Sequence, residues 1–300
     1  MKRRRVKNKR ISLLTDFIIA LVICIIMFSV SFITKTFKNE ELKETSSYQT
    51  PTSMFSKRNK ARENQNKALA KEILDEYKIE VNYGKETKDN VSALDATCLE
   101  DENIIYDNLK KLKETLLKYP QGFFNEFKNE SNNYSVSIYL VDKFSSRNVA
   151  LATRNTNNEF KIYISNDEEF EKVLHHELYH IIEYYIKLEY DINKLYRKWN
   201  DYNPQSYIYP ENVDDLDDKY VYKEGNKSDR VYFVSKYAKT NEKEDRAETF
   251  SDMMYRENKI FYYSKEHPVF NKANLISEVL EKSFKSVRED QQETWERFLK

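Results

Sequence analysis

Three of the chain's four histidines, His175, His176 and His180, fall within six positions, and Glu177 lies between two of them. His176, Glu177 and His180 form the pattern H-E-x-x-H. On a helix, residues four apart project from one face, so both imidazoles can reach a single ion. The glutamate is rotated by about 100°, where it can contact a water molecule on that ion without ligating it. This spacing predicts a catalytic metal site without His175; an amphipathic helix with surface histidines is the alternative.

A catalytic zinc ion needs a third protein ligand, and the local sequence does not supply one. The metzincin motif has a glycine three positions after its second histidine and a further histidine three positions later. This chain has Glu183 and Ile186 at those places. The third ligand must therefore be distant, and the candidates are His267 or a glutamate on a following helix.

Glu244 and Glu248 are four residues apart in "NEKEDRAETF", so they share one face of a predicted helix. One carboxylate can bind the metal while the other accepts the N–H of a ligand histidine. Asn241 with Glu244 also fits a capping box, in which the acid only closes the first turn. The pair by itself leaves both roles open.

The segments "HELYH" and "FVSKYAKTNEKEDRAETF" together resemble the zinc peptidases related to anthrax lethal factor and the bacterial zinc-binding metallopeptidases close to them. The resemblance covers roughly residues 105–257 and is specific at these two segments. It implies a zincin-like metalloprotease domain. It also implies a role for each matching residue: His176, His180 and Glu244 bind zinc, Glu177 is the general base, Tyr237 stabilises the oxyanion, and Glu248 orients a ligand histidine. Several members have a glycine where this chain has Tyr179, so the wall of the cleft is expected to differ there.

The elements that must position these residues follow from the hydrophobic pattern. The motif helix, residues 170–185, is predicted to start with a capping box of Ser165 and Glu168. A long Tyr- and Asp-rich connection, residues 190–236, follows it. Helices are predicted over 60–80, 103–120, from about 241, and over 274–299, and strands over 135–144, 148–154 and 159–165, the last two joined by a hairpin turn. Helices, a small sheet and further helices indicate the α+β class, and the last strand is expected to pair with an extended substrate.

Composition excludes several other function classes. Three glycines in 300 residues leave no Gly-rich phosphate loop, no dinucleotide fingerprint and no GxSxG elbow, so no nucleotide partner is expected. Residues 1–10 hold seven of the 50 basic side chains, which leaves 43 basic against 50 acidic side chains in the rest of the chain. No basic face for a nucleic acid is therefore expected. Cys98 lies in "ALDATCLEDEN", which offers no activating base.

The N-terminal segment predicts a membrane anchor. Residues 11–33 are apolar and carry no charge from Phe17 onward, and their length covers a hydrocarbon core of about 30 Å. The positive charge before them places residues 1–10 in the cytoplasm as a basic tail. Residues 34–60 are then a polar stalk, and residues 61–300 an extracellular peptidase domain. A cleaved signal peptide, which would release a secreted protein, is the alternative.

Together these expectations describe a membrane-anchored extracellular zinc endopeptidase that acts on a protein or peptide substrate. The alternative function is a catalytically inactive zincin-like domain, which would bind a cell-surface protein or a cell-wall partner through the Tyr-rich connection.

Overall fold

The computed structural model describes residues 51–128, 134–146, 149–154, 158–211, 216–223, 230–255, 267–288, 291–297 and 299. The chain divides into two compact units, Met1–Arg58 and Asn59–Lys300. The predicted basic tail, residues 1–10, and the predicted anchor, residues 11–33, lie outside the described residues. Among the helices that are described, none combines the length and the hydropathy needed to cross a membrane.

Helix α2 (Pro51–Tyr77) begins inside the segment predicted as a stalk, residues 34–60. Proline suits the first helical position because its φ angle is already helical and the N–H that it lacks would have no partner there. The helix ends before Lys78, which has a left-handed φ of 58°, and strand β1 (Ile79–Asn82) follows directly. The helix predicted over 60–80 therefore starts earlier and ends sooner than expected.

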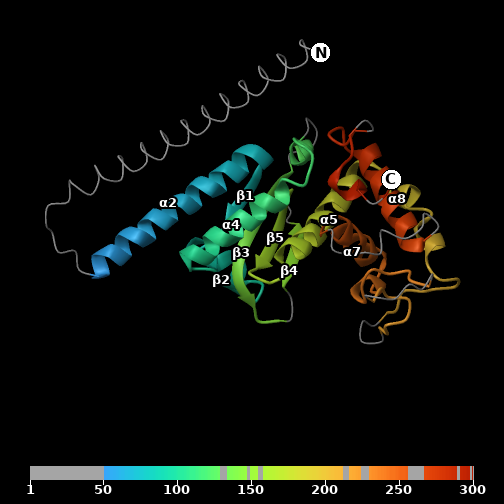
Figure 1. Cartoon of the computed structure of the whole chain (residues 1–300), viewed down its shortest axis with the longest axis horizontal. Coiled ribbons are helices and arrows are strands. Elements are labelled where there is room, and N and C mark those ends of the chain that lie inside the picture. The colour runs from blue at the N-terminus through green and yellow to red at the C-terminus, as the bar shows by residue number, and fades with distance from the viewer. Residues whose placement is uncertain are drawn as a thin grey trace, which may run out of the picture. The chain divides into compact units, whose positions relative to one another are not determined.

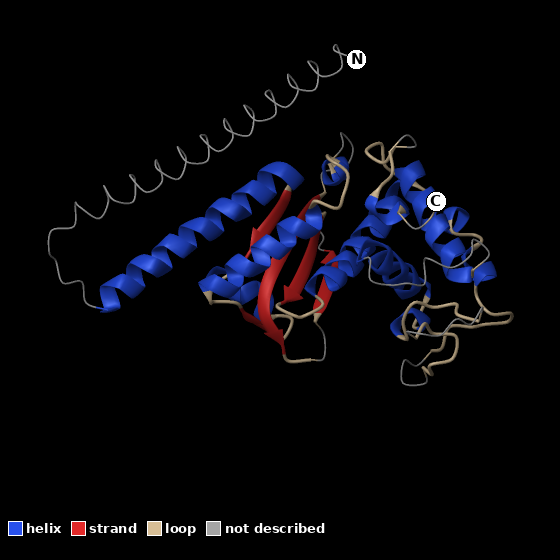
Figure 2. Cartoon of the chain, in the orientation of Figure 1, coloured by secondary structure: helices blue, strands red, loops and turns tan. Residues whose placement is uncertain are grey.

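The described strands form one mixed sheet in the order β1-β3-β5-β4, with β2 paired to the end of β3 (Figure 2). Strands β1, β3 and β5 run parallel, and β2 and β4 are antiparallel to their neighbours. The strands after β1 are β2 (Ala96–Cys98), β3 (Ser135–Phe144), β4 (Ala150–Arg154) and β5 (Glu159–Ser165). The three predicted strands are confirmed. Strands β1 and β2 were not predicted, because such short segments show no clear alternation of apolar and polar residues.

Strand β5 lies between β3 and β4, so both of its edges are already hydrogen-bonded. The expected pairing of residues 159–165 with an extended substrate is therefore wrong. Strand β4 pairs with the edge of β5 that faces away from β3, so β4 is the last strand in the order of the described strands.

The two faces of the sheet have different cores. Side chains that alternate along β3 and β5 enter the main core: Val136, Ile138, Leu140, Phe160, Ile162 and Ile164. They share this core with apolar residues of α2, α4 (Glu102–Leu116) and α5 (Phe170–Glu189). Figure 1 shows these helices and the sheet as ribbons. Tyr139, Val141 and Tyr163 point to the other face and form a smaller cluster with Val91 and Ala96. Helices therefore cover one face fully, as expected for a small sheet in an α+β domain.

The remaining helices are α3 (Lys88–Ser92), α6 (Ile192–Leu195), α7 (Glu242–Tyr255) and α8 (Pro268–Ser283). In the C-terminal half, α7 packs on α5, and α8 packs on α7. Single 3-10 turns occupy Lys85–Thr87, Phe123–Phe127, Trp199–Tyr202, Tyr237–Lys239 (η5) and Thr294–Glu296.

Helix α8 differs from the prediction of a helix over 274–299. It begins at Pro268, where the His267 side chain caps it, and it ends at Ser283. Phe284 leaves the helix because its ring stacks on Phe123, with 4.4 Å between the ring centroids. Tertiary packing thus overrides a sequence that is helical in pattern.

Candidate metal centre

Helix α5 carries the H-E-x-x-H residues, and its start differs from the prediction. The capping box of Ser165 and Glu168 is not formed, because the Ser165 hydroxyl donates to the carbonyl of Val149 at 2.9 Å. The helix has no side-chain cap at its N-cap residue Glu169, and the Asp167 carboxylate accepts the N–H of Glu169 at 3.0 Å in the turn before it. The apolar stripe predicted along the helix is buried: Phe170, Leu174, Leu178, Ile181 and Tyr185.

His175 is turned into the core and away from the other two histidines. Its Nδ1 lies 2.9 Å from the hydroxyl of Tyr119, and its side chain is fully buried. Burial lowers the pKa of His175 well below its usual value, so the ring is neutral. It packs as a core residue, as its place off the ligand face predicts.

His176, His180 and Glu244 come together in a compact triangle. The two Nε2 atoms are 3.0 Å apart. Glu244 Oε2 lies 3.0 Å from Nε2 of His176 and 3.2 Å from Nε2 of His180. Among the described histidine, cysteine and acidic side chains, these three form the group whose arrangement could hold a metal ion.

The dimensions of this triangle fit a tetrahedral ion. Ligand atoms about 2.0–2.1 Å from a tetrahedral zinc ion are about 3.3–3.4 Å from one another, slightly wider than the three observed distances. Without a proton or a metal ion, the facing lone pairs of two imidazole nitrogens and a carboxylate would repel. The triangle therefore needs a shared proton or a metal cation, and its N, N, O donors suit zinc.

Glu248 fixes the orientation of the first histidine. Nδ1 of His176 lies 2.7 Å from Glu248 Oε1, so Nδ1–H donates to the carboxylate and directs Nε2 toward the triangle. Burial opposes a charged ring, but the hydrogen bonds with Glu244 and Glu248 outweigh it and raise the pKa of His176 to about 10. Burial also acts against the Glu248 carboxylate, yet hydrogen bonds from His176 and Ser235 leave its pKa lowered. The arrangement matches what the resemblance implies for Glu248.

Glu177 lies beside the triangle and outside it. Its carboxylate is buried and hydrogen-bonded by the backbone of Ala152 in β4. Burial and the charge of Glu244 raise the pKa of Glu177, and the two histidines oppose this shift. A carboxyl group whose pKa is raised is better suited than an ordinary carboxylate to take up and return a proton.

Tyr237 stands at the opening of the site. It is 51% exposed, and its ring centroid is 5.8 Å from that of His176. Burial of its inner part and the neighbouring carboxylates raise the pKa of Tyr237 to about 12, so the phenol keeps its proton. A pocket of about 510 Å³ beside the triangle is lined by Val149, Ala150, Glu169, Lys172, Val173, His176, Glu177, Ser235, Lys236, Tyr237 and Glu248.

Helix α7 holds Glu244 in place through its neighbours. Asn241 Oδ1 accepts the backbone N–H of Glu244 at 3.1 Å, so Asn241 caps the helix while the Glu244 carboxylate remains with the histidines. Arg246 donates to both carboxylate oxygens of Glu183 on α5, at 2.9 and 3.2 Å. Both side chains are buried, so this bidentate pair ties the two ligand-bearing helices together.

Sequence reasoning missed a buried ionic group next to Glu244. Asp245 Oδ2 accepts from Lys272 at 2.6 Å, Trp199 at 3.0 Å and Tyr209 at 2.8 Å. The side chains of Asp245 and Lys272 are fully buried. The signal was a lysine inside the apolar stripe of α8, between Phe270 and Ala273, because a buried lysine needs an acidic partner.

His267 does not join the triangle. It lies at the start of α8, where its Nδ1 accepts the N–H of Val269 at 3.3 Å. The alternative that His267 supplies the third ligand is therefore not supported by its position, and capping accounts for it.

Tyr179 does not line the cleft, contrary to expectation. Its side chain is fully buried, with its hydroxyl bonded to Tyr196 and its ring stacked on Phe250 at 4.7 Å. Residue 179 projects from α5 into the core because it is one position before His180 and so about 100° away around the helix.

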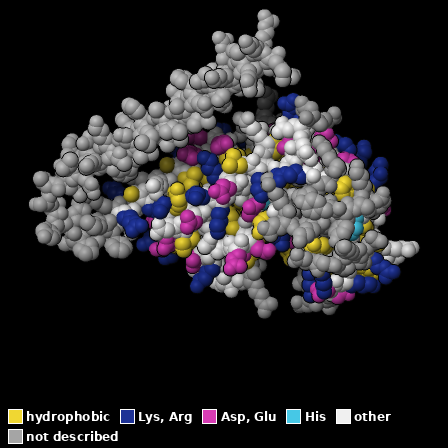
Figure 3. All heavy atoms as spheres, viewed as in Figure 1, with side chains coloured by type: hydrophobic (Ala, Val, Ile, Leu, Met, Phe, Trp, Pro, Cys, Tyr) yellow, Lys and Arg dark blue, Asp and Glu magenta, His cyan; other side chains and the backbone are white. Residues whose placement is uncertain are grey.

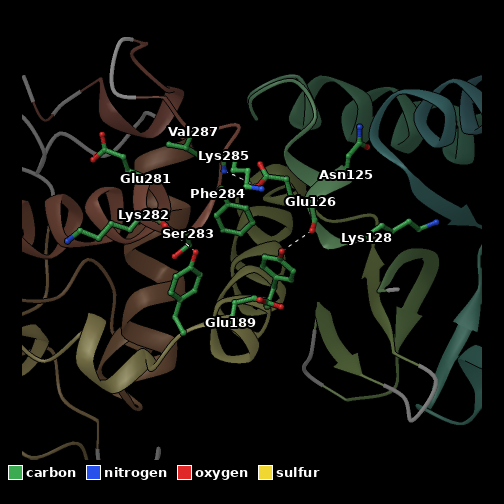
Figure 4. A pocket seen from close by; sticks show the side chains of 12 residues that line it. Asn125, Glu126, Lys128, Glu189, Glu281, Lys282, Ser283, Phe284, Lys285 and Val287 are labelled. Atoms are coloured by element: carbon green, nitrogen blue, oxygen red, sulfur yellow. Dashed lines mark hydrogen bonds between the residues drawn. The ribbon is translucent and has the colours of Figure 1, made fainter. Parts of the chain in front are cut away.

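Other surface features carry no comparable chemistry. Figure 4 shows a pocket of about 640 Å³ near the end of α5, where Glu126 accepts the backbone N–H groups of Lys285 and Ser286. Its lining contains no histidine or cysteine. On the face drawn in Figure 3, basic and acidic side chains of the described residues are interspersed.

No protein-family model and no curated protein sequence matches the chain. Among solved structures, it is similar to the crystal structure of a putative zinc-binding metallo-peptidase from Bacteroides caccae, with a TM-score of 0.47 and 13% sequence identity. The similarity covers 80% of this chain and 91% of that one.

Proposed function

We propose that the chain is a zinc-dependent endopeptidase with a zincin-like domain. One observation carries the catalytic part: the mutual distances of 3.0–3.2 Å among the ligand atoms of His176, His180 and Glu244, with Glu177 beside them. Three protein ligands leave the fourth position of a tetrahedral ion open, which is the arrangement of catalytic rather than structural zinc.

Glu177 acts as the general base in this proposal. When bound, zinc supplies Lewis acidity, which polarises a peptide carbonyl and lowers the pKa of a water molecule. Glu177 takes the proton from that water and passes it to the leaving amine. Its raised pKa, caused first by burial, suits a group that must both accept and return a proton.

Tyr237 stabilises the oxyanion that develops on the carbonyl. Its phenol remains protonated, since its pKa is raised to about 12 by burial and the nearby carboxylates, and a protonated phenol can donate. Tyr237 is 51% exposed and lines the pocket beside His176, where a substrate carbonyl would lie. Removal of such a donor typically costs about 10²–10³-fold in kcat.

The location outside the cell is proposed from the sequence. The seven basic residues within 1–10, followed by a segment uncharged from Phe17 to Ile33, support an anchor that leaves residues 61–300 outside. The mass of the mature chain tests this: a chain that has lost its first 30 or so residues would instead be a secreted protein.

The test of the catalytic proposal is Glu177→Gln in the full chain, assayed with a peptide library in the presence of zinc. We expect cleavage to fall by about 10²–10⁴-fold, because proton transfer is lost while the ligands remain. The zinc content should stay at the wild-type level. Glu189→Gln, at the end of the same helix and away from the triangle, is the matched control and should cleave normally.

Cleavage that persists in Glu177→Gln would overturn the mechanism. Zinc binding without any cleavage by the wild type would favour a binding domain. That alternative gains little from the Tyr-rich connection, because all of its described tyrosines except the exposed Tyr190 pack buried or partly buried against the core: Tyr196, Tyr202, Tyr207, Tyr209, Tyr220, Tyr222 and Tyr232.

A further inference from the structure

Ser235 lies between two parts of the site. One part is His176 and Glu248 on the helices α5 and α7, and the other is Tyr237 on the turn η5. Ser235 is half-buried, and it lines the 510 Å³ pocket together with His176, Tyr237 and Glu248. It lies two positions before Tyr237, which is the first residue of the turn η5. Ser235 belongs neither to the H-E-x-x-H motif nor to the segment with the paired glutamates.

The Ser235 hydroxyl has two polar neighbours. Its Oγ accepts the backbone N–H of Ala238 at 3.0 Å. It also faces the carboxylate of Glu248 in the pocket, and its interaction with that carboxylate helps to lower the pKa of Glu248. A hydroxyl is one donor and an acceptor, so one side chain satisfies both groups.

The carboxylate that Ser235 contacts is the one that holds His176. Glu248 Oε1 lies 2.7 Å from Nδ1 of that ring. A series of polar contacts therefore runs from the backbone of η5 through Ser235 and Glu248 to a candidate zinc ligand. Partners of a ligand histidine set the direction of its ring, and their loss commonly weakens metal binding by about 10- to 100-fold.

The far side of the turn is fixed independently. Lys239 is buried, and its Nζ donates to the carbonyl oxygens of Asp217 at 2.9 Å and Lys219 at 3.1 Å. The hydroxyl of Tyr207 donates to the carbonyl of Lys239 at 3.3 Å. With this end anchored, the Ser235 end determines how closely Tyr237 approaches His176.

We propose that Ser235 is a positioning residue that couples the orientation of His176 to the position of Tyr237. The effect on Tyr237 rests on the proposed peptidase function, whereas the effect on His176 does not. Loss of the hydroxyl should therefore weaken zinc binding and lower kcat, and each can be measured separately.

The first experiment measures the zinc dissociation constant of the full chain by competition with a chromophoric chelator. We expect Ser235→Ala to bind zinc about tenfold more weakly. Ser235→Thr, which keeps the hydroxyl, should restore an affinity within about twofold of the wild type. The matched control is Ser277→Ala, because the Ser277 hydroxyl also donates to a carboxylate, that of Glu296 at 2.6 Å, on a different helix from the ligands.

A zinc affinity of Ser235→Ala equal to that of Ser277→Ala would overturn the proposal. Equal midpoints of thermal unfolding for the two variants would show that a change in zinc affinity is not general destabilisation. A weakened Ser235→Thr would also contradict it, since the hydroxyl rather than the volume of the side chain is held responsible.

The second experiment is a double-mutant cycle on peptide cleavage with Ser235→Ala and Tyr237→Phe, at saturating zinc. If Ser235 acts through Tyr237, Ser235→Ala lowers kcat about tenfold in the wild type and changes it little in Tyr237→Phe. Fully additive losses would disprove the coupling. If the wild type cleaves no peptide at all, the proposed function fails while the zinc measurement still decides the role of Ser235 toward His176.

Discussion

The two nitrogens of His176 face two different carboxylates, and this decides how the residue handles a proton. Nδ1 lies 2.7 Å from Glu248 and Nε2 lies 3.0 Å from Glu244. Despite the opposing effect of burial, these contacts raise the pKa of His176 to about 10. In the metal-free protein the ring therefore holds a proton on Nε2, where a metal ion would bind.

Zinc binding should release this proton. At pH values below the His176 pKa of about 10, the proton on Nε2 must leave before zinc can bind. The apparent affinity of the chain for zinc therefore rises with pH. One released proton gives a slope of about one decade per pH unit between pH 6 and 9. Isothermal titration calorimetry at pH 7.5, in buffers of different ionisation enthalpy, measures the number of protons released.

Glu248→Gln is the control for this measurement. It removes one of the three carboxylates that raise the pKa of His176, those of Glu244, Glu248 and Glu177, so fewer protons should be released at pH 7.5. An affinity that does not change with pH in the wild type would show that His176 is already deprotonated in the metal-free chain.

The third ligand can be tested by comparing Glu244→Ala with His267→Ala. Loss of Glu244 leaves two ligands in the triangle, so zinc should be lost on dialysis, whereas His267→Ala should retain about one equivalent. Zinc content by atomic absorption decides between them. Loss of zinc from His267→Ala alone would reverse the assignment.

At the residue scale, the sequence was informative only where spacing determines geometry. The four-residue separation of His176 and His180 places both rings on one helix face in any helix. Glu244 is 68 positions from His176 and depends on how α7 packs on α5, so only the paired glutamates and the resemblance indicated it. Ser235 could not be found, because its role depends on two hydrogen bonds made through the fold.

At the scale of elements, α5 and α7 form the framework of the site. Glu183 follows His180 by three residues, and Arg246 follows Glu244 by two, so their bidentate pair lies one turn from the triangle. The distance between the helices is therefore set by a buried ionic contact close to the ligands. Helix α5 was predicted from its apolar stripe, whereas this contact required knowledge of which helix packs against it.

Arg246→Met should destabilise the protein by about 3–5 kcal/mol, because it leaves the Glu183 carboxylate buried without its main partner. Urea unfolding of the metal-free chain measures this, and zinc affinity should fall as the helices shift. Lys187→Met is the matched control: Lys187 also pairs with Glu183, at 2.9 Å, but is 33% exposed, so its loss should cost about 1 kcal/mol or less. Equal losses in the two variants would contradict the role given to Arg246.

At the scale of the whole described unit, Asp245 connects segments that are far apart in the chain. Through one carboxylate oxygen it binds Lys272 of α8 and Trp199 and Tyr209 of the long connection. Lys272 also donates to the carbonyl of Tyr232 at 2.9 Å, shortly before the segment that contains Ser235 and η5. The α+β class could be read from the order of elements, but this junction between connection, α7 and α8 could not, because it depends on long-range packing.

This junction predicts different outcomes for single and paired substitutions. Lys272→Met fills the same space but leaves the Asp245 charge unpaired in the core, which should cost about 3–5 kcal/mol. Adding Asp245→Asn removes that charge and keeps an oxygen that accepts from Trp199 and Tyr209, so the double variant should recover most of the loss. Urea unfolding of the single and double variants measures the coupling. If the double variant is as unstable as the sum of the two single variants, Asp245 and Lys272 do not act as a pair, and the connection must be held to α7 by its aromatic packing alone.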